Sequence, residues 1–140
     1  IVPVPIHKEK LKQRGFKQPA RISVHLGEKT GIPVFGDGLE RIKSTVPQRA
    51  LSSSERKANV DGAFRFNPRR QSVLKGKRVL LIDDIYTTGA TATACAKSLS
   101  EGGAVRVDFL ALASAGNKDH HLSEFAPVSC AGPYPDDKMI

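Results

Sequence analysis

Val79-Leu80-Leu81-Ile82-Asp83-Asp84-Ile85-Tyr86-Thr87-Thr88-Gly89-Ala90-Thr91 is the most informative segment of this 140-residue chain. Residues 79–82 form an apolar run, which is typical of a strand covered on both faces. Residues 83–89 follow as a polar turn. From residue 90 to residue 101 apolar side chains recur at helical spacing, at Ala92, Cys95, Ala96 and Leu99. Gly102-Gly103 ends this helix, and residues 105–112 form the next strand. A crossover of this kind predicts a parallel sheet.

The polar turn has the residue types of a sugar-phosphate site. Ligands of open parallel sheets bind outside the carboxyl ends of the strands, where Asp83 and Asp84 stand. The start of the next helix favours a phosphate, and it is surrounded by small or hydroxyl-bearing residues, Thr87, Thr88, Gly89, Ala90 and Thr91. The two carboxylates can accept hydrogen bonds from a vicinal diol, as on a ribose. Asp and Thr are also common in plain turns and caps, but nine consecutive residues of this kind favour a binding site. No Gly-Lys-Ser/Thr follows, so the segment is not a Walker A loop.

Shorter elements are predicted upstream of this unit. Residues 1–5 are typical of the end of a buried strand, and a helix is expected from Pro19 to a stop at Gly31. Residues 32–35, 39–42 and 63–66 are strand candidates, and residues 36–38 form a turn. Residues 44–63 are polar and are predicted to form a long loop. The tail, residues 116–140, receives no assignment.

Length and composition favour one soluble domain over residues 1–140. The chain is 39% hydrophobic and 26% charged, as ordinary soluble proteins are. No apolar run approaches the roughly 20 residues of a membrane span. The first residues lack an initiator Met and the layout of a signal peptide, so the chain is expected to start inside a longer protein. Cys95 and Cys130 lack paired spacing, which disfavours a disulfide scaffold or a zinc site and favours the cytoplasm.

The formal net charge of +8 is distributed unevenly. Residues 1–78 hold 18 Lys and Arg against 6 Asp and Glu, a net +12, and residues 79–140 hold 4 against 8, a net −4. A basic half of this kind can attract nucleic acid or a small polyphosphate, and charge alone leaves both open. Aromatic side chains for base stacking are few there, so only weak nucleic-acid binding is expected.

Residues 79–91 resemble the phosphoribosyl pyrophosphate signature of the type I phosphoribosyltransferases. More narrowly, residues 1–113 resemble the ComF (competence protein F-like) family. The supporting pieces are Val2-Pro3-Val4-Pro5, Arg14-Gly15-Phe16 with Gln18, Thr45 with Pro47-Gln48, Leu51-Ser52 with Glu55-Arg56, Asn59-Val60, Gly62-Ala63-Phe64 and Gly76-Lys77-Arg78-Val79. The resemblance implies the type I phosphoribosyltransferase fold, an α/β domain with a central, mostly parallel sheet flanked by helices. It also implies ribose contacts from Asp83 and Asp84 and a 5-phosphate cradle over residues 87–91. Members usually carry an N-terminal zinc-finger-like module that is missing here, so full-length members would bind zinc and this fragment would not.

Two further sites follow from the resemblance. A pyrophosphate loop after the first strand falls on residues 5–14, with His7, Lys8 and Arg14 as expected anion contacts; a solvated basic face is the alternative. A mobile loop that closes over the site falls on residues 52–62, where Arg56 and Lys57 would stabilise the departing pyrophosphate; a plain connector is the alternative. Tyr86 either packs over the ribose or is an ordinary turn aromatic, and Cys95 is interpreted as a core residue.

Together these features predict a phosphoribosyltransferase. It would bind phosphoribosyl pyrophosphate, transfer the 5-phosphoribosyl group to an unidentified acceptor and release pyrophosphate. The expected catalytic residues are Asp83, Asp84, Arg56 and Lys57. Mg²⁺ is the expected cofactor, bound through substrate oxygens and water near the acidic pair. The alternative is a non-catalytic protein that senses phosphoribosyl pyrophosphate or takes part in DNA transformation. The acceptor and the oligomeric state, a homodimer included, stay open.

Overall fold

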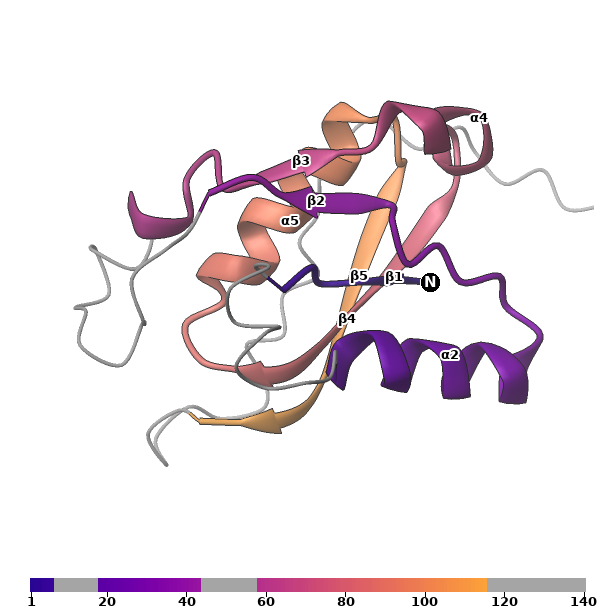
Figure 1. The fold of residues 1–140 in the computed structure, drawn as a ribbon, viewed down its shortest axis with the longest axis horizontal. Coiled ribbons are helices and arrows are strands. Elements are labelled where there is room, and N and C mark those ends of the chain that lie inside the picture. Colours follow the sequence, from indigo (N-terminus) through magenta and orange to yellow (C-terminus); the bar gives the residue numbers. More distant parts are fainter. Residues whose placement is uncertain (7–17, 44–57, 116–140) are drawn as a thin grey trace, which may run out of the picture.

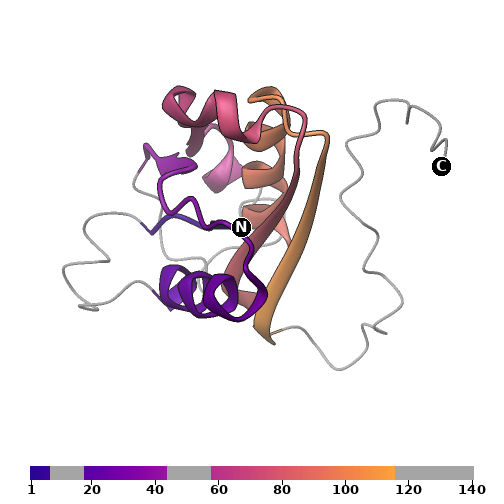
Figure 2. The same cartoon turned by 90° about the vertical axis from the view of Figure 1, so that its right-hand side faces the viewer.

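The computed structural model describes residues 1–6, 18–43 and 58–115 (Figure 1). Its centre is a three-stranded parallel sheet in the order β1 (Val2–Pro3), β4 (Arg78–Tyr86) and β5 (Arg106–Ser114). Figure 2 shows β4 and β5 side by side, paired from Arg78 and Arg106 to Tyr86 and Ser114. Helix α5 (Ala90–Glu101) connects them, so the predicted strand–helix–strand unit and its parallel sheet are confirmed.

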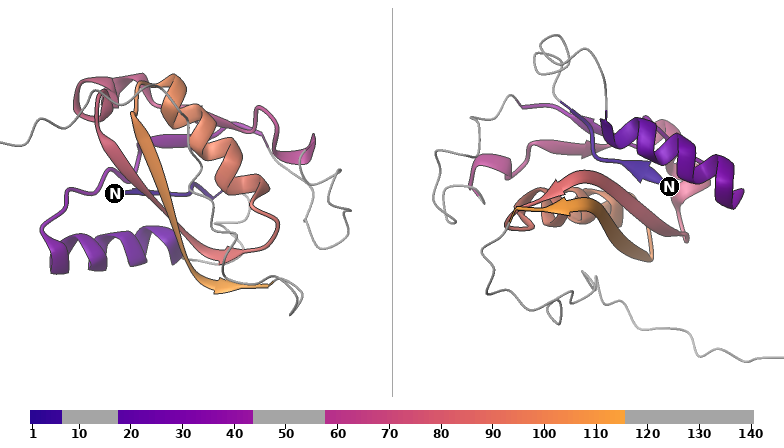
Figure 3. Two further views of the ribbon diagram at one scale, coloured as in Figure 1. Left: turned by 180° about the vertical axis from the view of Figure 1, so that it is seen from behind. Right: turned by 90° about the horizontal axis from the view of Figure 1, so that it is seen from below.

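Both faces of β4 are covered. Leu81 and Ile82 are neighbours in a strand and point to opposite faces, yet neither is accessible to solvent. Helix α2 (Gln18–Thr30) packs against β4 and β1, while α5 lies on the opposite face with β2 (Leu39–Arg41) and β3 (Phe64–Phe66) (Figure 3). The fold is therefore α/β with a parallel sheet flanked by helices. None of the helices in the described ranges is long and apolar enough to cross a membrane.

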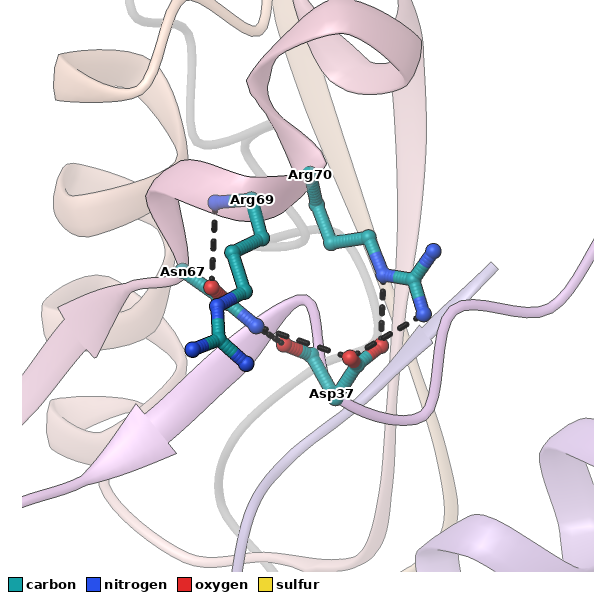
Figure 4. A network of polar contacts seen from close by, with 4 residues as sticks. All are labelled: Asp37, Asn67, Arg69 and Arg70. Carbon is teal, nitrogen blue, oxygen red and sulfur yellow. Dashed lines mark hydrogen bonds and ion pairs between the residues drawn. The ribbon is translucent and has the colours of Figure 1, made fainter.

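The two strands β2 and β3 form a small antiparallel sheet, which Asp37, Asn67 and Arg70 fasten at one end (Figure 4). The Arg70 guanidinium donates to both carboxylate oxygens of Asp37, at 2.8 and 3.1 Å. Asn67 Nδ2 donates to the Asp37 carbonyl at 2.9 Å, and Asn67 Oδ1 accepts from the backbone N–H of Arg69 at 3.1 Å. The second bond caps the 3₁₀ helix η2 (Pro68–Arg70), which leads into the short helix α4 (Gln71–Leu74). These contacts join the residue range before β2 to the range after β3.

Replacing Asn67 by Ala should lower the free energy of unfolding by roughly 1–3 kcal/mol. Asn67 is buried, so its loss leaves the Asp37 carbonyl and the Arg69 N–H without those bonds. The matched control is Arg69→Ala, since Arg69 is exposed and its hydrogen bond in this network comes from its backbone N–H, which Ala retains. Urea denaturation of both variants measures the effect. Equal stability of the two variants would contradict the role given to the Asn67 side chain.

The predicted strand at residues 32–35 is wrong, although this segment does lie beside the first strand. The N-terminal amine of Ile1 donates to the Pro33 carbonyl at 2.7 Å, and the Phe35 N–H donates to the Ile1 carbonyl at 2.9 Å. Pro33 has no N–H of its own, so the ladder cannot be extended through it. The segment is therefore an irregular connection held by two hydrogen bonds.

The predicted turn at residues 83–89 is too long. Residues 83–86 belong to β4, because β5 continues to supply backbone partners: Asp83 pairs with Ala111 and Ile85 with Ala113. Only residues 87–89 form the turn. β5 itself runs over Arg106–Ser114 rather than residues 105–112, which is part of the same extension.

The other predicted elements agree with the structure more closely. The strands near residues 1–5, 39–42 and 63–66 are present as β1, β2 and β3, and α2 begins at Gln18 and ends before Gly31. Residues 58–60, inside the predicted loop 44–63, are helical instead, because Val60 is buried in the core. Residues 44–57 lie outside the described ranges. The helices η2 and α4 were not predicted at all.

Candidate functional site

A pocket of about 190 Å³ lies at the carboxyl end of β4. Its described walls come from the residues that follow β1, the end of β4 with the start of α5, and single residues of α2, β2 and β5. The lining consists of Val4, Pro5, Ile6, Pro19, Arg41, Asp83, Asp84, Ile85, Tyr86, Thr87, Gly89, Thr91, Ala92 and Phe109. This is the place where open parallel sheets bind their ligands.

The acidic pair lies in the last part of β4, before Ile85 and Tyr86. Asp83 and Asp84 both line the pocket, and the Asp84 N–H donates to Asp83 Oδ1 at 2.9 Å. The position of this pair is set by the sheet, because Asp83 is still paired with Ala111 of β5. Two adjacent carboxylates on a strand end can accept hydrogen bonds from two hydroxyls of one ligand.

Burial raises the pKa of Asp83 to about 7, and the negative charge of Asp84 adds to this shift. The hydrogen bond from the Asp84 N–H and the positive charge of Arg41 act in the opposite direction and lower the same pKa. The pair is therefore a site where a proton is held near neutral pH. A carboxyl group with a raised pKa in a pocket is more common at functional sites than elsewhere.

The turn between β4 and α5 forms the second chemical feature of the pocket. Gly89 precedes α5 with a φ of +75°, a left-handed conformation that glycine adopts without strain. Thr87, Gly89 and Thr91 line the pocket, so hydroxyl groups and a helix N-terminus face the same cavity as the two carboxylates. Thr88 is exposed and Ala90 is buried, and neither lines this pocket. Their predicted phosphate contacts stay predictions.

Tyr86 packs within the turn. A Cβ atom at Gly89 would lie 3.0 Å from the Tyr86 hydroxyl oxygen, and the Tyr86 ring centroid is 6.0 Å from that of Phe109. Tyr86 also lines the pocket, so its ring borders both the turn and the cavity. Its packing against β5 and Gly89 gives this aromatic a structural role beside the predicted ribose contact, which is untested.

Replacing Gly89 by Ala should weaken inorganic phosphate binding several-fold, with a stability loss of about 1 kcal/mol. The new Cβ carries left-handed backbone strain and crowds Tyr86, so the turn must move. Gly31→Ala is a matched control, because Gly31 has a φ of +72°, open space around it and a place outside the pocket. Calorimetric phosphate titration compares the two variants. The idea fails if Gly31→Ala and Gly89→Ala bind phosphate equally well.

Five of the predicted site residues lie outside the described ranges. These are His7, Lys8 and Arg14 of the predicted pyrophosphate loop, and Arg56 and Lys57 of the predicted closing loop. Their roles stay predictions. Among the described residues, no group of three or more His, Cys, Asp or Glu side chains could hold a metal ion.

Arg41 is a lining residue that sequence reasoning missed. Among the lining residues in the described ranges it is the only Lys or Arg, and its guanidinium carbon lies 5.4 Å from the centre of the Phe64 ring. Burial lowers the pKa of Arg41, and the charge of Asp83 acts against that shift. The spacing of residues in the predicted strand was a signal for it. Leu39 and Arg41 are two residues apart and lie on the same face of the strand, and Leu39 is a core residue.

Cys95 lies on α5 and is not among the described lining residues of the pocket. It is buried, as predicted for a core residue, and burial raises the pKa of its thiol. The negative charge of Asp83 raises the pKa of this thiol further, and the positive charge of Arg41 lowers it. A buried, protonated thiol is a packing group rather than a nucleophile.

Comparison with known proteins finds relatives named competence proteins and relatives named DNA utilization proteins. Competence protein F of Haemophilus influenzae is 32% identical over 115 residues, which is 82% of this chain and 50% of the relative. DNA utilization protein YhgH of Salmonella typhi is 31% identical over 107 residues, 76% of this chain and 45% of the relative. Competence protein ComFC of Bacillus subtilis is 32% identical over 104 residues, 74% of this chain and 39% of the relative. The chain thus spans half or less of the length of these relatives. No protein-family profile matches the chain, and no solved structure matches it.

Proposed function

From the similarity to Competence protein F and ComFC, which supports membership of the ComF family, we propose that this chain binds phosphoribosyl pyrophosphate. We further propose that it has the type I phosphoribosyltransferase fold and that it transfers the 5-phosphoribosyl group to an acceptor. The acceptor would be a second substrate that supplies the nucleophile.

One observation carries this proposal: the two carboxylates and the turn at residues 87–89 line the same pocket. Asp83 and Asp84 come from the end of β4, and Thr87, Gly89 and Thr91 come from the turn and the first residues of α5. The carboxylates suit two neighbouring hydroxyls and repel a phosphate placed on them. The turn with its helix N-terminus suits a phosphate. A sugar that carries a diol at one end and a phosphate at the other satisfies both parts.

The proposed chemistry needs no covalent nucleophile from the protein. The bond between C1 of the ribose and the pyrophosphate oxygen breaks, the electron pair leaves with pyrophosphate, and the acceptor forms the new bond to C1. While the bond to pyrophosphate breaks, positive charge develops on the ribose, next to Asp83 and Asp84, and it disappears as the acceptor bonds to C1. The protein would act by holding the ribose phosphate in place and by stabilising this charge. The predicted closing loop with Arg56 and Lys57 would exclude water.

The donor set of the pocket fits Mg²⁺ that is bound mainly by the ligand. Mg²⁺ prefers oxygen atoms and keeps several waters, so it is commonly held by substrate oxygens with few protein groups. The described lining offers carboxylate and hydroxyl oxygens and no His or Cys side chain. When bound, the ion would neutralise charge on the departing pyrophosphate.

A second candidate function is a non-catalytic role in DNA uptake or transformation. The relatives named competence proteins and the relative named a DNA utilization protein favour such a context. The net charge of +12 on residues 1–78 is also compatible with a nucleic-acid partner. In this case the pocket would sense phosphoribosyl pyrophosphate without turning it over.

A titration of the chain with phosphoribosyl pyrophosphate, with and without Mg²⁺, tests the binding proposal. We expect binding that Mg²⁺ strengthens, followed by pyrophosphate release when a suitable acceptor from a set of free bases, amines and ammonia is added. Binding without release by this chain and by the longer parent protein would favour the sensing role. No binding under either condition would refute both.

A further inference from the structure

Arg41 lines the pocket, and the residues around it fix its position. Strand β2 places it opposite Phe64 of β3, and the guanidinium lies over the Phe64 ring at 5.4 Å from the centroid. Phe64 is itself buried, and its carbonyl accepts a hydrogen bond from the Ser98 hydroxyl of α5 at 3.0 Å. The end of this small sheet is fastened by Asp37, Asn67 and Arg70. The strand that carries Arg41 and the Phe64 ring beside its guanidinium are therefore joined to α5, the helix that follows the turn at residues 87–89.

Arg41 of β2 and Asp83 of β4 face the same cavity from two different strands. Asp83 on β4 and Cys95 on α5 both interact with Arg41 electrostatically. Arg41 and Asp83 line the same pocket, and Cys95 is buried in the core. Arg41 therefore shares the pocket with the carboxylate that would hold a ribose hydroxyl. A cation beside two adjacent carboxylates also offsets their mutual repulsion.

We propose that Arg41 is a positioning residue for Asp83. Its guanidinium, stacked on Phe64, holds the Asp83 carboxylate in the direction that the ribose diol requires. The inference rests on the proposed function, because it assigns Arg41 to the diol part of that same pocket. Arg41 differs in this from the cations expected for the pyrophosphate, which come from His7, Lys8 and Arg14.

The test compares three ligands that separate the diol from the anions. Ribose 5-phosphate carries the diol and one phosphate, whereas inorganic phosphate and pyrophosphate carry no diol. For Arg41→Gln we expect about 10-fold weaker binding of ribose 5-phosphate, with phosphate and pyrophosphate affinity nearly unchanged. Arg41→Lys keeps the charge and should recover part of the loss. Weaker pyrophosphate binding with unchanged ribose 5-phosphate binding would overturn the proposal, because Arg41 would then contact the anion.

The matched control is Arg65→Gln on the neighbouring strand β3. Arg65 is exposed and pairs with Glu40 at 2.8 Å, and it does not line the pocket. This variant removes an arginine from the same small sheet and should bind all three ligands as the unmodified chain does. An equal loss in Arg65→Gln would show that the sheet, and not Arg41, determines the affinity, and would overturn the assignment.

A double-mutant cycle tests whether Arg41 acts through Asp83. In the Asp83→Asn background, Arg41→Gln should cause almost no further loss of ribose 5-phosphate affinity. Additive losses would refute the positioning role, because they would show that Arg41 acts independently of Asp83.

A ligand-free measurement keeps this inference separate from the proposed function. The side-chain carboxyl ¹³C signal of Asp83 should shift in Arg41→Gln and stay in place in Arg65→Gln. If the chain binds no ribose phosphate at all, the proposed function fails, and the signal alone decides whether Arg41 positions Asp83. An unchanged Asp83 signal in Arg41→Gln would overturn the inference even if the chain binds phosphoribosyl pyrophosphate.

Discussion

Changing Asp83 and Asp84 together to Asn should weaken phosphoribosyl pyrophosphate binding by about 100-fold or more. Each carboxylate would lose a charged hydrogen bond to a ribose hydroxyl, and such bonds contribute roughly 1.5–3 kcal/mol each. Asn keeps the size and one acceptor oxygen, so the Asp84 N–H can still be bound by residue 83. Calorimetry at pH 8 is suitable, because Asp83 with its pKa of about 7 is mostly ionised there.

Inorganic phosphate separates the two parts of the pocket in this experiment. It should bind the double variant nearly as well as the unmodified chain, because the turn at residues 87–89 and the start of α5 are retained. Asp61→Asn is a control for the loss of a carboxylate, since Asp61 is exposed and lies outside the pocket lining. Equal losses for phosphate and phosphoribosyl pyrophosphate in the double variant would mean that diol and phosphate are not bound by separate groups.

The single change Asp83→Asn should stabilise the folded chain at pH 8, by on the order of 4 kcal/mol. In the unfolded chain the pKa of this group returns to the ordinary value of 3.8, whereas burial raises it to about 7 in the folded chain. The folded state therefore holds the proton more tightly. Below about pH 4 the group is protonated in both states and does not lower the free energy of unfolding. As the pH rises from there through about 7, the unfolded chain loses the proton more readily than the folded chain, so the free energy of unfolding falls. Asn cannot ionise and avoids this loss.

Urea denaturation of Asp83→Asn at a series of pH values measures the effect. The stability difference from the unmodified chain should be largest near pH 8 and should fall toward zero near pH 4. A difference that is constant with pH would contradict the raised pKa. A gain in stability together with a loss of ligand affinity is the pattern expected when a binding group is kept at a cost to the fold.

Much of the architecture can be predicted from the sequence because its signals are local. The apolar run at residues 79–82 and the helical spacing of Ala92, Cys95, Ala96 and Leu99 permit few packings, and a crossover between them gives a parallel sheet. The end of β4 is different. Residues 83–86 have the composition of a turn, and they are extended because β5 supplies backbone partners as far as Ser114. That partnership is not visible in the local sequence.

The candidate site was predictable only in part for a similar reason. Asp83, Asp84 and the turn are contiguous, so one short motif indicates them together. Arg41 reaches the same pocket from a strand distant in sequence, and its place depends on the pairing of β2 with β3. Alternation along β2 shows that Arg41 shares a face with Leu39, but it does not show what that face meets. When segments far apart in the sequence form one pocket, each segment can be predicted by itself, but the local sequence does not show that they meet.

The pairing of β1 with β4 has a consequence for how the chain reaches its folded state. Val2 lies opposite Leu81, and the Val4 N–H donates to the Ile82 carbonyl at 2.8 Å, so within the described ranges the first strand has no strand to pair with until residues 78–86 have been made. During synthesis on the ribosome, Ile1, Val2 and Val4 would stay exposed while β4, α5 and β5 form from contacts much closer in sequence. We expect the first strand to dock last. In pulsed hydrogen exchange during refolding, the Val4 amide should gain protection after the amides of β5, and simultaneous protection would contradict this order.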